Sequence, residues 1–343
     1  MARVELEESG GYYFSRRNDR LEFIDSGCAV LNCTLGGGWP LSRIANIVGD
    51  ESTGKTLLAI EACANFSRQY PRGNIYYRES ESAFDEDYAG ALGMPLERVK
   101  FIEPEDFMTV EDFYEDLVKA AEDTKKHDCA GLYIVDSLDA LSDKAEMKLD
   151  FDAGSYNMTK AKQIGKLLRQ CRLEVAKARI CLVIISQTRD RITEGFMARY
   201  AKKKTRSGGR ALDFYASQCL WLSHMDHISE TVDKVKEDVG IRIMAKCEKN
   251  KISLPYRKCE FTIRFGQGID SLISSMDWLE KYGKWDEAVD VTRQTYTKRI
   301  NAMSDGEYWD ECKRLDERVT ELWELREEKV LGHTRRKYQT ASV

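Results

Sequence analysis

Apolar residues form two kinds of pattern along this chain, short continuous runs and longer segments with helical spacing. Continuous runs at residues 43–48, 130–137 and 180–187 predict strands that are buried on both faces of a sheet. Residues 109–126 and 159–177 instead repeat their apolar side chains at helical spacing, which predicts amphipathic helices. Strands that alternate with helices in this way predict an α/β domain with a mostly parallel central sheet.

Shorter signals extend the predicted sheet. Residues 73–78 and 99–102 each predict a strand. Three later runs predict strands that lie antiparallel at an edge of the sheet, at residues 218–223, 239–247 and 258–265.

From about residue 275 the strand signals stop, and helical patterns that carry tryptophan take their place. We therefore expect three parts: a short N-terminal arm at residues 1–25, an α/β core at residues 26–272 and a helical region at residues 273–343. Residues 332–343 are expected to be disordered.

The stretch between the strand at 43–48 and a helix predicted at 57–64 fits a phosphate-binding loop. Its residues, Gly49, Asp50, Glu51, Ser52, Thr53, Gly54, Lys55 and Thr56, match the pattern G-x-x-x-x-G-K-[ST]. The glycines allow backbone N–H groups to surround an anion, and the helix N-terminus adds partial positive charge. In such a loop Lys55 reaches the β- and γ-phosphates, and the Thr56 hydroxyl ligates Mg²⁺.

Polar residues at the ends of other predicted strands complete a candidate nucleotide site. Asp136 closes an apolar run, where open α/β sheets bind ligands, and it can hold Mg²⁺ directly or through water. Glu81 follows the strand at 73–78, next to the loop strand, and is our choice for the group that positions or deprotonates the attacking water, with Glu79 as the alternative. The Gln187 amide can hydrogen-bond the γ-phosphate and report its presence to the following loop.

The segment 188–210, directly after Gln187, is strongly basic. Eight basic residues and two acidic ones give it a net charge of +6, in a chain whose net charge is −5. Cations contact phosphates and aromatic rings stack on bases, so the segment suits single-stranded nucleic acid, although a solvated charged loop has the same composition. The candidate DNA-binding residues here are Arg189, Arg191, Phe196, Arg199, Lys202, Lys203, Lys204, Arg206, Gly208, Gly209 and Arg210.

Composition excludes several classes of protein. Of 343 residues, 42% are hydrophobic and 32% charged, and the longest uncharged stretch, residues 26–42, is too short and too polar to span a bilayer. The 10 cysteines include no Cys-x-x-Cys pair and no secretory leader is visible, so we expect free thiols and a cytoplasmic location. His224 and His227 have no evident third ligand, which argues against a metal site there.

In their order along the chain, these motifs resemble those of the bacterial RecA recombinase family and its virus-borne relatives. The resemblance covers roughly residues 26–270, with the segments GDESTGKT, ESESAFDEDYAGALGM, LYIVDSLDAL, IISQTR, SGGRALDFYAS and KNKISLPYRKCEF. It implies a P-loop ATPase core that uses ATP and Mg²⁺, forms a filament on single-stranded DNA and pairs that strand with a homologous duplex. Hydrolysis would reset the filament.

The resemblance also implies roles for single residues. Glu81 matches the catalytic glutamate, Gln187 the γ-phosphate sensor, and Tyr88 the residue that stacks on adenine. Lys249 and Lys251 would reach ATP bound to the neighbouring subunit. A first DNA-binding loop would span about residues 143–157 and offer Lys144, Lys148 and Tyr156.

Departures from the family keep two other functions open. The N-terminal arm is shorter than the family's polymerisation helix, the tail is basic at residues 335–337, and the second DNA-binding loop is richer in lysine. One alternative is a RecA-fold ATPase without strand exchange, such as a helicase-type motor or a regulatory paralogue. The other is a nucleotide-dependent DNA-binding scaffold with negligible hydrolysis. The paired lysines and the basic segment favour the recombinase, and Glu81 argues against the scaffold.

Overall fold

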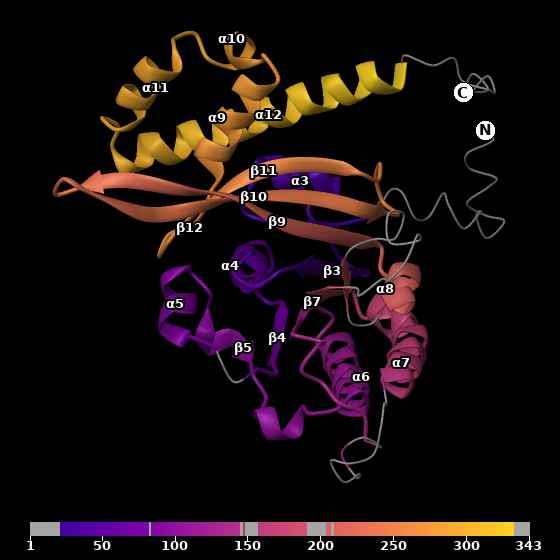
Figure 1. Cartoon of the computed structure of the whole chain (residues 1–343). Coiled ribbons are helices and arrows are strands. Elements are labelled where there is room, and N and C mark those ends of the chain that lie inside the picture. The colour runs from indigo at the N-terminus through magenta and orange to yellow at the C-terminus, as the bar shows by residue number, and fades with distance from the viewer. Residues whose placement is uncertain are drawn as a thin grey trace, which may run out of the picture.

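A computed structural model of the chain describes residues 21–81, 84–144, 147, 157–190, 204–206 and 209–332. Within these residues, ten strands form one sheet in the order β12-β11-β10-β9-β3-β7-β6-β4-β5, with β8 attached to β7 (Figure 1). The strands of this sheet are β3 (Ile44–Gly49), β4 (Asn74–Glu79), β5 (Val99–Lys100), β6 (Gly131–Asp136), β7 (Ile180–Asp190), β8 (Lys204–Arg206), β9 (Gln218–Val232), β10 (Val235–Asn250), β11 (Arg257–Arg264) and β12 (Gly268–Asp270). Two short strands, β1 (Phe23–Ile24) and β2 (Trp39–Pro40), pair separately.

Helices cover both faces of the sheet. They are α3 (Ala29–Leu35), α4 (Lys55–Gln69), α5 (Glu86–Ala91), α6 (Val110–Lys126), α7 (Asn157–Lys177), α8 (Gly209–Tyr215), α9 (Ser271–Lys281), α10 (Trp285–Ala288), α11 (Arg293–Ile300) and α12 (Asp305–Gly332). Short 3₁₀ turns lie at Leu96–Arg98 and Pro104–Asp106. This architecture confirms the predicted α/β fold with a helical C-terminal region.

The central strands β9, β3, β7, β6, β4 and β5 run parallel to one another, as the alternating pattern predicted. One expectation was wrong in detail: the run at 218–223 does not lie at an antiparallel edge. It begins β9, which runs parallel to β3 on one side and antiparallel to β10 on the other. The antiparallel edge consists of β10, β11 and β12.

Alternate side chains of each central strand enter two hydrophobic clusters, one on each face of the sheet. On β6, Leu132 and Ile134 join the cluster that contains α4 and the C-terminal helices. Tyr133 and Val135 join the cluster formed with α6 and α7. Burial on both faces explains why this strand reads as a continuous apolar run in the sequence.

The start of α6 shows how local sequence fixes a helix boundary. The Thr109 hydroxyl accepts the Asp112 N–H at 3.1 Å, and the Asp112 carboxylate accepts the Thr109 N–H at 3.0 Å. This reciprocal capping box satisfies two donors that the first helical turn leaves without partners. The helix begins at Val110, close to the predicted start.

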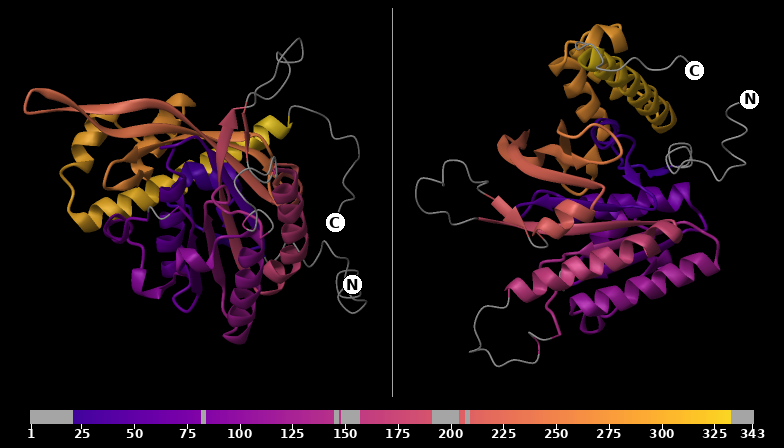
Figure 2. Two further views of the ribbon diagram at one scale, coloured as in Figure 1. Left: turned by 60° about the horizontal axis from the view of Figure 1, so that its bottom comes forward. Right: turned by 90° about the vertical axis from the view of Figure 1, so that its right-hand side faces the viewer.

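The strands β9 and β10 form a hairpin much longer than the runs that predicted them. In Figure 1 and in the left view of Figure 2 the hairpin extends past the rest of the sheet. Gly240 is the first residue of β10 that pairs with β11. The residues of β10 before it, from Val235 to Asp238, pair with β9 alone. The charged, weakly apolar sequence of this outer part explains why its strand character was not predicted.

The helices α9 to α12 lie along one face of the antiparallel edge (Figure 1). Leu315, Val319, Leu322 and Trp323 of α12 are buried in the same cluster as the core residues of β3 and α4. The region expected to be a separate part therefore shares one hydrophobic core with the sheet. None of the helices that the structure describes is both long and apolar enough to cross a membrane.

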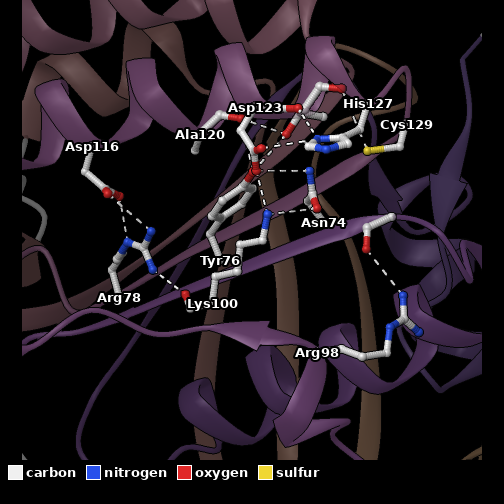
Figure 3. A network of polar contacts seen from close by, with 12 residues as sticks. Asn74, Tyr76, Arg78, Arg98, Lys100, Asp116, Ala120, Asp123, His127 and Cys129 are labelled. Atoms are coloured by element: carbon white, nitrogen blue, oxygen red, sulfur yellow. Dashed lines mark hydrogen bonds and ion pairs between the residues drawn. The ribbon is translucent and has the colours of Figure 1, made fainter.

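A polar network stabilises the opposite edge of the sheet, between β4, β5 and α6 (Figure 3). Arg78, which is 4% exposed, pairs with Asp116 at 2.6 Å, and its guanidinium lies 5.3 Å from the centre of the Tyr133 ring. The Tyr76 hydroxyl donates to Asp123 at 2.6 Å. Between β4, which carries Arg78 and Tyr76, and β9 lie β6, β7 and β3, and between β4 and β8 lie β6 and β7.

Candidate nucleotide-binding site

The phosphate-binding loop leaves the carboxyl end of the central strand β3 and enters α4 at Lys55. Gly54 has φ of 81°, in the region that favours glycine, and a Cβ at this residue would lie 2.5 Å from Ile263 Cδ1. A Cβ at Gly49 would lie 2.4 Å from the Thr53 hydroxyl oxygen. Both glycines of the motif are therefore required by space or by backbone conformation.

Lys55 lies with its amine inside this loop. Its Nζ donates to the Asp50 carbonyl oxygen at 2.6 Å, and the residue is 9% exposed. Burial lowers the pKa of Lys55, while the carboxylates of Asp136 and Glu81 act in the opposite direction. A cation surrounded by N–H groups at a helix N-terminus forms an anion-binding site.

Thr56 and Asp136 bring two oxygen atoms together beside the loop. The Thr56 hydroxyl donates to Asp136 Oδ2 at 2.8 Å, and the Tyr77 hydroxyl donates to the same oxygen at 2.8 Å. Burial raises the pKa of Asp136, and these two hydrogen bonds oppose the rise. Hard oxygen ligands of this kind fit Mg²⁺, which is held by one or two protein oxygens with waters and substrate phosphates completing its shell.

Glu81 and Gln187 meet at one carboxylate oxygen. The Gln187 amide Nε2 donates to Glu81 Oε1 at 3.0 Å, and the Ser137 hydroxyl donates to the same oxygen at 2.5 Å. The alternative residue, Glu79, accepts the backbone N–H of Glu81 at 2.8 Å. The structure thus joins the predicted catalytic glutamate to the predicted sensor, and it orients Glu79 toward the backbone of Glu81.

Two further contacts fix the start of the segment that follows Gln187. The Gln187 backbone N–H donates to Asp139 Oδ2 at 2.7 Å. The Thr188 hydroxyl donates to Asp50 Oδ1, within the phosphate-binding loop. Because β7 lies beside β3 with Gln187 in register with Gly49, this strand end and the loop lie side by side.

The sequence suggested that the basic segment is a loop, but a part near each of its ends forms a strand. β7 continues to Asp190, and residues 204–206 return as β8, with Thr188 in register with Arg206. Arg206 is 6% exposed, and its side chain hydrogen-bonds Asn46 and Asp213. In this structure the Arg206 guanidinium is therefore buried and bonded within the protein, and the DNA contact expected from the sequence stays a prediction.

The other DNA-binding candidates, in this segment and in the loop expected at 143–157, remain predictions. The backbones of Arg189, Lys204, Gly209 and Arg210 belong to β7, β8 and α8. The candidates outside the described residues are Lys148, Tyr156, Arg191, Phe196, Arg199, Lys202, Lys203 and Gly208. Lys144, from the first expected DNA-binding loop, forms ion pairs with Asp112 at 3.1 Å and Glu115 at 3.4 Å.

Lys249 and Lys251 lie together near the end of α8. Both amines donate to the Phe214 carbonyl oxygen, at 3.0 Å and 2.8 Å. Lys249 is in register with Cys219, and Cys219 is in register with Asn46, well before the phosphate-binding loop at the end of β3. Within one chain, the two lysines therefore lie toward the opposite end of the parallel strands from the loop.

Tyr88, the expected adenine-stacking residue, belongs to α5. Its ring is partly buried against the larger hydrophobic cluster, and its N–H donates to the Asp85 carboxylate at 2.9 Å. The helix α5 follows β4 and Glu81 in the chain, on the face of the sheet that also carries α4. The adenine contact itself stays a prediction.

Sequence reasoning missed four residues around this site: Tyr77, Ser137, Asp139 and Thr188. Ser137 is the last residue of the strand predicted at 130–137, Asp139 comes two residues after it, and Thr188 directly follows the strand predicted at 180–187. Their position at strand ends was the signal that could have found them. Tyr77 gave no such signal, because a tyrosine inside an apolar run is typical of a hydrophobic core.

Comparison with known proteins agrees with this geometry. The family model described as the RecA N-terminal domain matches residues 13–270. Protein RecA of Nostoc punctiforme is 31% identical over 264 residues, which cover 77% of this chain and 68% of the relative. Protein RecA of Arthrospira platensis is 33% identical over 264 residues (77% and 67%), and that of Gloeobacter violaceus 32% over 272 residues (78% and 69%). The chain therefore belongs to the RecA family.

Proposed function

We propose that this protein is an ATP-dependent DNA recombinase, which assembles as a filament on single-stranded DNA and exchanges strands with a homologous duplex. The contact that carries the proposal is the hydrogen bond from Gln187 to Glu81. It links a group suited to activating water with the strand that leads directly into the basic segment. A change at the γ-phosphate would therefore reach the DNA-binding residues through one strand end.

Different residues in and around the loop bind the nucleotide and support its hydrolysis. Lys55 and the loop N–H groups bind the phosphates, and Thr56 and Asp136 would hold Mg²⁺, which neutralises developing charge on the phosphate oxygens. Glu81 accepts a proton from the attacking water or orients it, while Ser137 keeps its carboxylate in place. Tyr88 contacts the adenine.

A second copy of the chain completes the site. Lys249 and Lys251 lie away from their own loop, so they would contact ATP bound to a neighbouring subunit in a cytoplasmic filament. Their amines, close together, match the negative charge of a triphosphate. The DNA partner is bound by the remaining cations of the basic segment and of residues 143–157.

One experiment tests this function: ATP hydrolysis is measured with and without single-stranded DNA, alongside strand exchange on homologous duplex. We expect DNA to stimulate hydrolysis and exchange to require ATP. If DNA stimulates hydrolysis but no strands are exchanged, the protein is a RecA-fold ATPase without strand exchange. If it binds DNA without hydrolysing ATP, it is a DNA-binding scaffold.

Two matched variants assign the catalytic group in the same assay. Glu81→Gln should retain nucleotide and DNA binding but lower turnover by about 100-fold or more, because the amide accepts no proton from water. Glu79→Gln should keep most of the turnover. The reverse result would move the catalytic role to Glu79.

A further inference from the structure

The strand β8 is fixed to the core by one buried side chain. Arg206 Nη2 donates to Asp213 Oδ1 at 2.5 Å, Nη1 donates to Asn46 Oδ1, and the guanidinium lies 5.6 Å from the centre of the Trp221 ring. A buried guanidinium is tolerated only where its donors meet acceptors. The position of β8 is therefore tied to these partners.

Asn46 connects this arginine to two strands at once. It lies inside β3, and its Nδ2 donates to the Ile184 carbonyl oxygen at 2.7 Å and to the Ser186 hydroxyl at 3.0 Å, both on β7. With both amide protons used on β7, Oδ1 is the atom that faces Arg206. One side chain of the phosphate-loop strand thus joins β3, β7 and β8.

The other strand of the pair is fixed to the phosphate-binding loop. Thr188 is in register with Arg206 across β7 and β8, and its hydroxyl donates to the Asp50 carboxylate. The two chain ends that bound residues 191–203 are therefore each bonded to β3 or to the loop that follows it. A displacement of the loop that also moves β3 would therefore reach both ends.

We propose that Arg206 is a positioning residue, which couples the phosphate-binding loop to the basic segment through Asn46 and does not itself contact DNA. This inference rests on the proposed function, because it takes residues 191–203 as the part that contacts DNA. It assigns to Arg206 a role different from the one that its basic neighbours suggested.

The test uses the full chain and the variants Arg206→Met, Asn46→Leu and the double variant. Trypsin cleavage within residues 191–203 is measured with ADP and with a non-hydrolysable ATP analogue, without DNA. In the unaltered chain we expect the cleavage rates measured with the two nucleotides to differ by at least about fivefold. Each single variant should remove this difference, and the double variant should remove no more, because both residues act through one contact.

Arg78→Met is the matched control, since Arg78 is also a buried arginine that pairs with one carboxylate (Figure 3) and lies over an aromatic ring, and its strand β4 is separated from β8 by β6 and β7. It should lower the thermal midpoint but keep the nucleotide effect. The proposal is overturned if Arg206→Met keeps the effect, if Arg78→Met loses it equally, or if the unaltered chain shows none.

A second measurement separates coupling from direct contact. DNA affinity is compared in the two nucleotide states. Arg206→Met should reduce the ratio of the two affinities, whereas an equal loss in both states would make Arg206 a DNA contact and contradict the proposal. The two ideas can fail separately. If the nucleotide changes the cleavage rate but DNA does not stimulate ATP hydrolysis, the proposed function is wrong while the coupling through Arg206 holds.

Discussion

Single carboxylate oxygens collect several donors in this site, and that arrangement decides what each residue can do. Glu81 Oε1 accepts from Ser137 and Gln187, and Asp136 Oδ2 accepts from Thr56 and Tyr77. The sequence identified one member of each pair, because motif spacing marks residues at strand ends. It gave no indication of Tyr77, because the partners that a residue inside a strand meets depend on the register of the sheet.

The lysines near α8 lead to a prediction on pH. Burial, with a smaller effect of Lys251, lowers the pKa of Lys249 to about 8. The charged form, which a neighbouring phosphate needs, is therefore present below pH 8 and lost above it. Nucleotide-dependent self-association should weaken by up to about tenfold per pH unit above that value, because binding then takes up one proton. Light scattering at pH 7, 8 and 9 measures this dependence.

Lys249→Arg is the control for this dependence, because a guanidinium stays charged over the whole range. Its association should stay level between pH 7 and 9. A Lys249→Arg variant that follows the same pH profile as the unaltered chain would show that another group is responsible.

At the scale of elements, the order of strands and helices follows from the hydrophobic pattern, while the lengths of several elements do not. β7 runs three residues past the predicted end at Gln187, and β9 and β10 continue far beyond the apolar runs that start them. Those extensions are held by main-chain pairing with a neighbouring strand. A charged sequence carries no sign of such pairing, so the basic residues after Gln187 were read as loop.

The hairpin turn gives a prediction at this scale. Asp233 and Lys234 join β9 to β10 with φ values of 51° and 71°, the positive pair that a type I′ turn requires. Lys234→Gly should stabilise the hairpin by about 0.5–1 kcal/mol, because glycine adopts this φ without a steric penalty. Hydrogen exchange of the β9 and β10 amides should slow accordingly.

Lys236→Gly supplies the comparison, since Lys236 is also exposed but lies in the extended part of β10. There glycine should destabilise the hairpin by about 0.5–1 kcal/mol. Equal effects of the two substitutions would mean that the turn conformation contributes nothing specific.

For the whole molecule, the shared hydrophobic cluster decides how the chain unfolds. Leu322 of α12 is 1% exposed in the cluster that also contains β3 and α4. Leu322→Ala should cost about 2–5 kcal/mol and lower the stability of the nucleotide site with the rest, in one transition. Denaturation followed by tryptophan fluorescence and by nucleotide binding should give coincident curves.

Leu325→Ala, three residues further on α12, is the matched substitution at a residue that is 49% exposed. It should change the stability by no more than about 0.5 kcal/mol. Two separate transitions, with the nucleotide site lost independently of α12, would instead support the division at residue 273 expected from composition. Composition detects a change of element type and carries no information on whether two regions share a core.

The long hairpin has a mechanical consequence. One end of β10 carries Lys249, and the other end, at Val235, lies about 45 Å away for a strand rise of about 3.3 Å per residue. The part of β10 from Gly240 to Cys247 is held between β9 and β11, whereas the part from Val235 to Asp238 pairs with β9 alone. The outer end of the hairpin is therefore the part of β10 that neighbouring strands restrain least, and its amides should exchange hydrogen faster than those of residues 240–247.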